Sequence, residues 1–311
     1  RIGVITLPKF YIDFEAYRKR DPNYKSTTRD VRLLLDTLNQ EKVDAVVLDL
    51  RNNGGGSLQE SIELTGLFIE KGPVVQVKDT RGQIEVHQDE DSNVAWKGPF
   101  GVIINRYSAS ASEIFAGAIQ DYGRGIILGS STFGKGTVQS AVDMSRFISS
   151  VNKLKLKAAG ESKDSDTPNG APEFGQINVT IAKFYRINGS STQHKGVDPD
   201  VSFPTQFTSE KYGESSEPAA LPWDQIRSTN FTKINDLTAI KNQLASKHEA
   251  RMKTSAEYKF LLEDIDEFTK AMSTTSTISL NEAKLKKERD ENKAKNRNRL
   301  NKLLELNNMP L

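Results

Sequence analysis

A serine and a lysine that could act together lie within residues 105–139, NRYSASASEIFAGAIQDYGRGIILGSSTFGKGTVQ. Ser110 stands where an apolar run gives way to a helical pattern, and the free amides of a helix N-terminus suit the oxyanion of acyl transfer. Lys135 lies between two glycines, and a lysine amine that burial strips of its hydration can lose its proton and act as a base. These residues predict a serine nucleophile with a lysine base.

Both residues also have ordinary structural interpretations. Residues 110–113 read SASE, a capping box in which Ser110 caps the helix and Glu113 reaches back to it. A lysine in a Gly-Lys-Gly turn is usually a solvated surface residue. The local sequence leaves the two interpretations open.

A glycine turn supplies a third feature. Residues 54–56 are all glycine, and they follow an apolar run at residues 43–50 that is typical of a buried strand. Glycines let backbone amides approach a substrate closely, and neighbouring parallel strands would place this turn beside the one that holds Ser110. Although an ordinary tight turn would look similar, the three features together suggest nucleophilic catalysis beside an amide-lined anion site.

A phosphate loop is the rival interpretation of residues 129–136, GSSTFGKG, which differ by one residue from G-x-x-x-x-G-K-[ST]. A glycine follows Lys135 where the magnesium-binding hydroxyl belongs. The next residues, TVQSAV, alternate like a strand, whereas a phosphate loop opens a helix. Both departures disfavour nucleotide binding.

The apolar periodicity predicts an α/β fold, with strands at residues 2–7, 43–50, 99–106, 125–129 and 176–186. Helices are expected over residues 26–38, 57–69 and 110–122, and a hairpin around residues 81–82. Alternating lysine and leucine predict a further, half-buried strand at residues 153–157. Polar stretches predict loops at residues 10–25 and 158–175, a linker at 205–230, and a solvated helix within 280–306.

Composition sets broad limits on function. The 311 residues suffice for one large domain or two, and 43 Lys+Arg against 41 Asp+Glu create no global field for nucleic acid or an anionic membrane. The absence of cysteine excludes disulfides and thiolate metal sites, and the three histidines show no ligand spacing, so no metal or cofactor is expected. No apolar run reaches membrane-spanning length, and no leader precedes the first strand, so we expect the chain to belong to a longer protein.

Four segments resemble the C-terminal processing peptidases, most closely their tail-specific protease branch: DLRNNGGGSL, YSASASEIFAGAIQDYGRGIILG, FGKGTVQ and FYRINGSSTQHKGVDPDV. They occur in the family's order within residues 1–205. The resemblance implies a crotonase/ClpP-like α/β serine peptidase core over residues 1–205. It implies a helical C-terminal domain of the tail-specific protease type over residues 206–311.

The resemblance also implies roles for particular residues. Ser110 matches the nucleophile, Lys135 its general base and Gln139 the residue that orients the lysine amine. The oxyanion hole would use the amide of Ala111 and one from the turn at Gly55 and Gly56.

Two acidic residues match supporting positions of the family. Asp121 matches an aspartate that supports the site in the tail-specific branch, and Glu113 matches a glutamate needed structurally there. Gly54 is a departure, because many relatives have proline at this position, and it should loosen the oxyanion turn.

The implied function is that of a serine endopeptidase that cleaves protein substrates near apolar C-termini through an acyl-enzyme, in the bacterial periplasm or cell envelope. Relatives usually carry a PDZ domain, which presents substrate C-termini by strand addition and is expected upstream of these residues. No nucleic-acid partner is expected, whereas an adaptor protein and the oligomeric state stay open. A non-catalytic peptide-binding scaffold of the same fold and the phosphate-binding interpretation of Gly129 to Gly136 are the alternatives.

Overall fold

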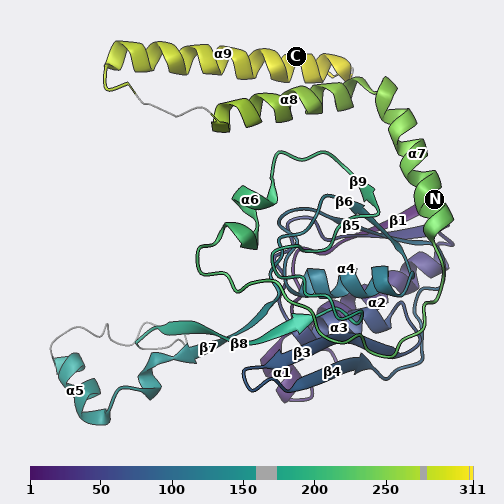
Figure 1. The fold of residues 1–311 in the computed structure, drawn as a ribbon, viewed down its shortest axis with the longest axis vertical. Coiled ribbons are helices and arrows are strands. Elements are labelled where there is room, and N and C mark those ends of the chain that lie inside the picture. The colour runs from purple at the N-terminus through teal and green to yellow at the C-terminus, as the bar shows by residue number, and fades with distance from the viewer. Residues whose placement is uncertain (159–173, 274–278, 308, 311) are drawn as a thin grey trace.

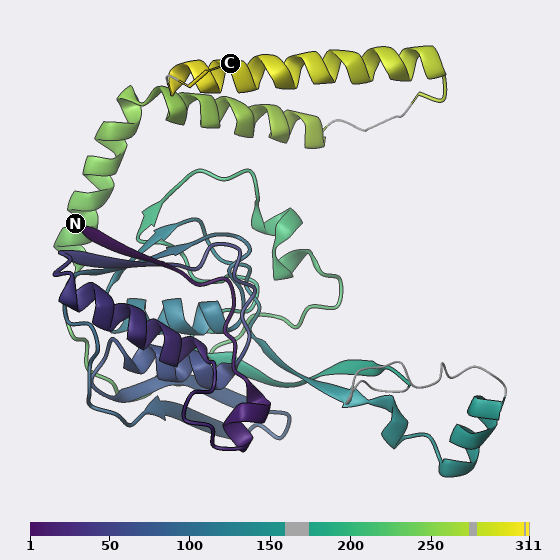
Figure 2. The same cartoon turned by 180° about the vertical axis from the view of Figure 1, so that it is seen from behind.

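Two sheets enclose a layer of helices in the computed structural model, which describes residues 1–158, 174–273, 279–307 and 309–310 (Figures 1 and 2). Within these residues, a parallel sheet has the strand order β1-β2-β5-β6-β9. Its strands are β1 (Ile2–Thr6), β2 (Ala45–Asp49), β5 (Phe100–Ile104), β6 (Ile126–Gly129) and β9 (Val201–Ser202). An antiparallel sheet has the order β4-β3-β8-β7 and comprises β3 (Gly72–Asp79), β4 (Ile84–Asp89), β7 (Thr137–Asp143) and β8 (Gln176–Tyr185).

The helix that follows Ser110 lies in the centre of this arrangement. Helices α3 (Leu58–Gly66) and α4 (Ala111–Asp121) pack between the two sheets, and α2 (Thr27–Gln40) packs against α3 and β1 (Figure 1). All residues of α4 are buried except Gln120, as its apolar sequence predicts, since a helix that is apolar on every side needs cover on every side. The entrance of α4 is therefore held rigidly by the core.

The strands and helices expected from periodicity are present, but the strand expected at residues 153–157 is wrong. This segment belongs to the helix α5 (Ser150–Ala158), at the tip of the arm formed by β7 and β8 (Figure 1). Val151 and Leu154 are largely exposed there, so no sheet face favours a strand, and leucine, lysine and alanine are good helix formers. The loop expected at residues 10–25 contains a short helix, α1 (Phe14–Arg18), and most of the loop expected at 158–175 lies outside the described residues.

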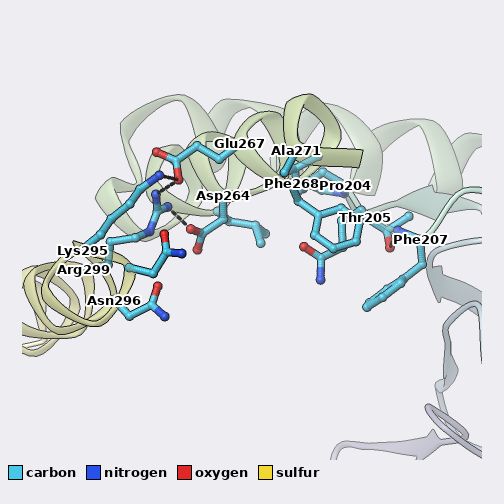
Figure 3. Close-up of a pocket in the computed structure, with 14 residues that line it drawn as sticks. Pro204, Thr205, Phe207, Asp264, Glu267, Phe268, Ala271, Lys295, Asn296 and Arg299 are labelled. Carbon is cyan, nitrogen blue, oxygen red and sulfur yellow. Dashed lines mark hydrogen bonds and ion pairs between the residues drawn. The ribbon is translucent and has the colours of Figure 1, made fainter. Parts of the chain in front are cut away.

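The C-terminal region is helical and connects back to the sheets. It contains α6 (Ser209–Tyr212), α7 (Thr238–Thr254), α8 (Ala256–Ser273) and α9 (Glu282–Leu306). Helix α7 packs against β9 and leads to the antiparallel pair α8 and α9 (Figures 1 and 2). Helix α9 is largely exposed, as its composition predicts, but it contacts α8 through ion pairs such as that of Arg299 with Glu267 at 2.5 Å (Figure 3).

The segment expected to be a linker instead lies against residues 189–191, which follow β8. The Trp223 indole N–H donates to the Ser191 carbonyl oxygen at 2.9 Å, and the Ile226 N–H donates to the Gly189 carbonyl oxygen at 2.9 Å. These hydrogen bonds fix residues 223–226 against the core. In the part of the chain that the structure describes, no helix is both long enough and apolar enough to cross a membrane.

Candidate active site

Three turns that follow neighbouring strands of the parallel sheet form the site. The glycine turn follows β2, the Ser110 turn follows β5 and the Lys135 turn follows β6, and these strands pair in that order. The Asn52 N–H donates to Asn105 Oδ1, and Asn105 Nδ2 donates back to Asn52 Oδ1, both at 2.9 Å. The expected placement of the glycine turn beside the Ser110 turn is confirmed.

The backbone of Ser110 has an unusual conformation. Its φ of 57° and ψ of −112° lie outside the regions that residues with a side chain ordinarily adopt, whereas a serine that only caps a helix has extended backbone angles. Such strain persists where the surrounding structure enforces it, and it is typical of functional sites. Serine nucleophiles on sharp strand-to-helix turns show the same design, since the turn presents the hydroxyl away from the chain.

Glu113 ties the Ser110 turn to the Lys135 turn. Its carboxylate is fully buried and accepts hydrogen bonds from the Ser110 N–H at 2.7 Å and the Lys135 N–H at 3.0 Å, both through Oε2. Its Oε1 accepts from the Thr132 hydroxyl at 2.6 Å and the Gly134 N–H at 2.7 Å. Burial raises the pKa of Glu113 to about 7, against the effect of these four donors. A single carboxyl group therefore fixes how the backbone of Ser110 lies relative to that of Lys135.

The Lys135 amine lies next to Gln139, the residue expected from the family resemblance to orient it. Lys135 is half-buried, and its Nζ donates to Gln139 Oε1 at 3.2 Å. Among the described residues, no hydrogen bond joins this amine to the Ser110 hydroxyl. Catalytic hydrogen bonds are often long without substrate and tighten when substrate binds. Within the described residues, the Lys135 amine is thus bound to Gln139 and not to Ser110.

The glycine turn lies directly against Ser110 and Ala111. Gly55 has a φ of +99°, and a Cβ on it would lie 2.9 Å from Ser110 Cβ and 3.0 Å from Ala111 N, so only glycine fits. The Gly55 N–H already donates to Asn53 Oδ1 at 2.9 Å. Within the described residues, the N–H groups of Gly56 and Ala111 have no acceptor. These two amides are the candidates for an oxyanion hole.

Asp121 lies at the opposite end of α4 from Ser110. Eleven residues at about 1.5 Å per residue separate the two by roughly 16 Å along the helix. The Asp121 carboxylate accepts from Arg186 Nη2 at 2.6 Å and from Asn188 Nδ2 at 2.8 Å. Its contacts anchor the end of α4 to the end of β8, so any support for the site is indirect.

Two buried side chains that the sequence did not single out also contact the site. Asn53 donates from Nδ2 to the Leu7 carbonyl oxygen at 2.8 Å and accepts the Gly55 N–H, so it fixes the glycine turn. Gln193 accepts the Gly136 N–H at 2.7 Å, next to Lys135. An asparagine ahead of glycines is a turn signal that could have indicated the first. Gln193 lies in a segment that carried the family resemblance, without an assigned role.

A cavity of about 780 Å³ lies elsewhere, between residues 204–207 and helices α8 and α9 (Figure 3). Its walls include Phe207, Phe268 and the ion pairs of Arg299. None of the predicted site residues lines it. The cavity is therefore separate from the candidate active site.

Comparisons with known proteins agree with this geometry. The model of Peptidase family S41 matches residues 1–203, and that of the C-terminal domain of tail specific protease matches residues 207–311. Tail-specific protease of Haemophilus influenzae is 41% identical over 303 residues, which are 96% of this chain and 39% of the relative. Carboxyl-terminal-processing peptidase 2 of Arabidopsis thaliana is 42% identical over 193 residues, which are 62% of this chain and 32% of the relative.

A solved structure, the photosystem II D1 C-terminal processing protease, is similar with a TM-score of 0.49 and 28% identity, over 68% of this chain and 45% of that one. The chain thus spans 39% of the length of the Haemophilus relative that it matches. The match of residues 1–203, together with a related sequence along almost the whole chain, shows that this protein belongs to peptidase family S41.

Proposed function

We propose that the protein is a serine endopeptidase in which Ser110 is the nucleophile and Lys135 the general base. The observation that carries the proposal is the strained backbone of Ser110, tied through buried Glu113 to the turn of Lys135. A capping box accounts for the hydrogen bond from the Ser110 N–H to Glu113, but neither a cap nor a surface lysine requires the further bond from the Lys135 N–H to the same carboxylate oxygen. Gln139 would orient the amine, and the amides of Gly56 and Ala111 would stabilise the oxyanion.

In the proposed reaction, Ser110 Oγ attacks the carbonyl carbon of a peptide bond while its proton passes to the neutral Lys135 amine. The oxyanion of the tetrahedral intermediate accepts hydrogen bonds from the two free amides. The protonated amine then gives its proton to the leaving nitrogen, and the C–N bond breaks to leave an ester on Ser110. Water, deprotonated by the same amine, hydrolyses the ester and restores the serine.

In the described part of the chain, the Lys135 amine makes no hydrogen bond to the Ser110 hydroxyl, so substrate binding must bring these two groups together. To accept the Ser110 proton, the amine nitrogen has to come within hydrogen-bond distance of the Ser110 hydroxyl, and it can do so while one of its N–H groups still donates to Gln139. A lysine side chain has enough rotatable bonds for this movement while its backbone stays fixed on Glu113. We infer that the structure represents the resting form of the dyad.

The proposed substrates are unstructured protein chains with apolar C-termini, in the periplasm or envelope of a bacterium. The names of the relatives support action at C-termini, since one is a tail-specific protease and another a carboxyl-terminal-processing peptidase. A PDZ domain outside these residues would deliver the C-terminus, and an adaptor protein could add selectivity.

Peptide cleavage by the full-length protein tests the proposal. Ser110→Ala and Lys135→Ala should each lower turnover of an unstructured peptide with an apolar C-terminus by at least about 10³-fold. Lys155→Ala, at an exposed lysine of α5, is the matched control and should keep wild-type turnover. Retained cleavage in the Ser110 variant would refute the assignment, and peptide binding without cleavage by the wild type would favour the scaffold.

The phosphate-binding alternative lacks support in the structure. The residues after Lys135 form the strand β7 rather than a helix whose N-terminus could meet a phosphate. A thermal shift with magnesium nucleotide would be needed to reopen it.

A further inference from the structure

We propose that Gln193 is a positioning residue for the base and that Glu214, from the C-terminal region, orients Gln193. This inference rests on the proposed function, because it concerns the placement of Lys135. It assigns the C-terminal region a direct part in organising the active site.

Gln193 connects the lysine turn to Glu214. Its side chain is fully buried, its Oε1 accepts the Gly136 N–H at 2.7 Å and its Nε2 donates to Glu214 Oε1 at 3.1 Å. A backbone N–H can only donate, and an ionised carboxylate can only accept, so the amide has one satisfactory orientation. Removing the carboxylate leaves a buried N–H without an acceptor, and the amide loses the contact that fixes it.

The rest of the lysine turn is held from the same two segments. The His194 N–H donates to the Gly134 carbonyl oxygen at 2.8 Å, and the Glu214 N–H donates to the Phe133 carbonyl oxygen at 3.0 Å. Together with Gln193, these contacts fix the backbone on both sides of Lys135. Only the lysine side chain is then free to move toward Ser110, which makes its reach depend on how firmly the turn is held.

The position of Glu214 depends in turn on the tail helices. The segment before it packs through the ring of Tyr212, whose centroid lies 5.0 Å from that of Phe207 and 6.5 Å from that of Phe268 in α8 (Figure 3 shows both phenylalanines). A Cβ on Gly213 would lie 3.1 Å from the Phe133 carbonyl oxygen, so the segment meets the lysine turn closely. A chain of contacts therefore runs from α8 through residues 212–214 to the turn of the base.

Kinetics of the full-length protein test this inference. Glu214→Ala should lower kcat for the peptide substrate by roughly 10- to 100-fold at unchanged KM, because it displaces the base without touching substrate. Glu214→Gln keeps an oxygen that can accept from Gln193 and should recover most of kcat. Glu217→Ala removes an exposed carboxylate from the same segment and should match the wild type.

Exchanging the two side chains distinguishes a loss of positioning from a variant that merely unfolds. Gln193→Glu places two carboxylates together and should be impaired, whereas Gln193→Glu combined with Glu214→Gln restores one acceptor for Gly136 and one donor between the two side chains. Recovery of kcat in the double variant supports the inference. A wild-type kcat in Glu214→Ala, a loss of kcat no larger than the loss of folded protein, or failure of the swap would overturn it.

Ser110→Ala in the same assay separates this inference from the proposed function. If Ser110→Ala retains activity, the serine mechanism itself is wrong. If it is inactive while Glu214→Ala is normal, only the role of Gln193 and Glu214 is lost.

Discussion

Replacing Glu113 with glutamine tests two properties of the buried carboxylate separately. One is the electrostatic cost of burying it, and the other is the set of hydrogen bonds by which it joins the Ser110 turn to the Lys135 turn. The substitution keeps the size of the side chain but removes the charge. Oε1 and Oε2 each accept two hydrogen bonds, so an amide nitrogen must replace one of these acceptors and face donors. We expect the link between Ser110 and Lys135 to loosen and kcat to fall by on the order of 100-fold.

The electrostatic cost of burying Glu113 can be measured from how the free energy of unfolding changes with pH. Burial raises the pKa of Glu113 from 4.5 to about 7 on folding, so the folded wild type binds more protons than the unfolded chain in this range. Its free energy of unfolding should therefore fall as the pH rises from about 4.5 to 7, by about 3 kcal/mol at roughly 1.4 kcal/mol per pKa unit. Glutamine does not titrate, so the variant becomes more stable relative to the wild type over this window, although it is less active.

Urea unfolding between pH 4.5 and 8 measures this difference, since all other titrating groups are common to both proteins. Glu249→Gln, at an exposed glutamate of α7, is the control and should show a difference that does not change with pH. The reasoning would be refuted if the difference in unfolding free energy between Glu113→Gln and the wild type stays constant with pH, or if it shifts in favour of the wild type at higher pH.

Three further predictions concern the backbone and the ion pair around the site. Ser110→Gly should be more stable to urea than Ser110→Ala by about 1–3 kcal/mol, because glycine adopts a φ of 57° and ψ of −112° without strain. Asp121→Ala should lower the free energy of unfolding by about 1–3 kcal/mol, because Arg186 is largely covered and loses its carboxylate but keeps Gln120 as an acceptor, while kcat of the folded fraction changes little. Gly54→Ala should raise the free energy of unfolding by about 0.4–1 kcal/mol, and the thermal midpoint with it, since no atom lies within 4 Å of the added Cβ. Equal stability of the two Ser110 variants, a large kcat loss in Asp121→Ala, or a lower midpoint for Gly54→Ala would contradict the respective argument.

The arrangement of the site was predictable because it follows from strand order. An apolar strand followed by a polar turn and a helix places the turn at the carboxyl end of a parallel strand, and neighbouring strands bring such turns together. This rule predicted the glycine turn beside Ser110, as the paired hydrogen bonds of Asn52 and Asn105 show. A separate pattern, the alternation of TVQSAV, predicted the strand after Lys135.

Other features left no pattern in the sequence. The capping box indicated the contact of Glu113 with Ser110, but the strained backbone of Ser110 also depends on the glycine turn, which meets it only in the folded chain. The contact of Gln193 with Glu214 joins a loop to the first residue of a three-residue 3₁₀ helix, and neither is long enough to show a periodicity. The alternation of lysine and leucine at residues 153–157 led to the wrong prediction of a strand. So short a segment fits a strand or a helix, and it is helical because no strand in the described part of the chain pairs with it.

Covalent labelling of Ser110 tests the central claim most directly. A fluorophosphonate forms a phosphorus–oxygen bond with an activated serine and releases fluoride, and mass spectrometry locates the adduct. We predict an adduct on the peptide that contains Ser110, formed by the wild type and at least about 10²-fold more slowly by Lys135→Ala. An adduct on another residue, or equal labelling rates in the two proteins, would contradict the serine and lysine mechanism.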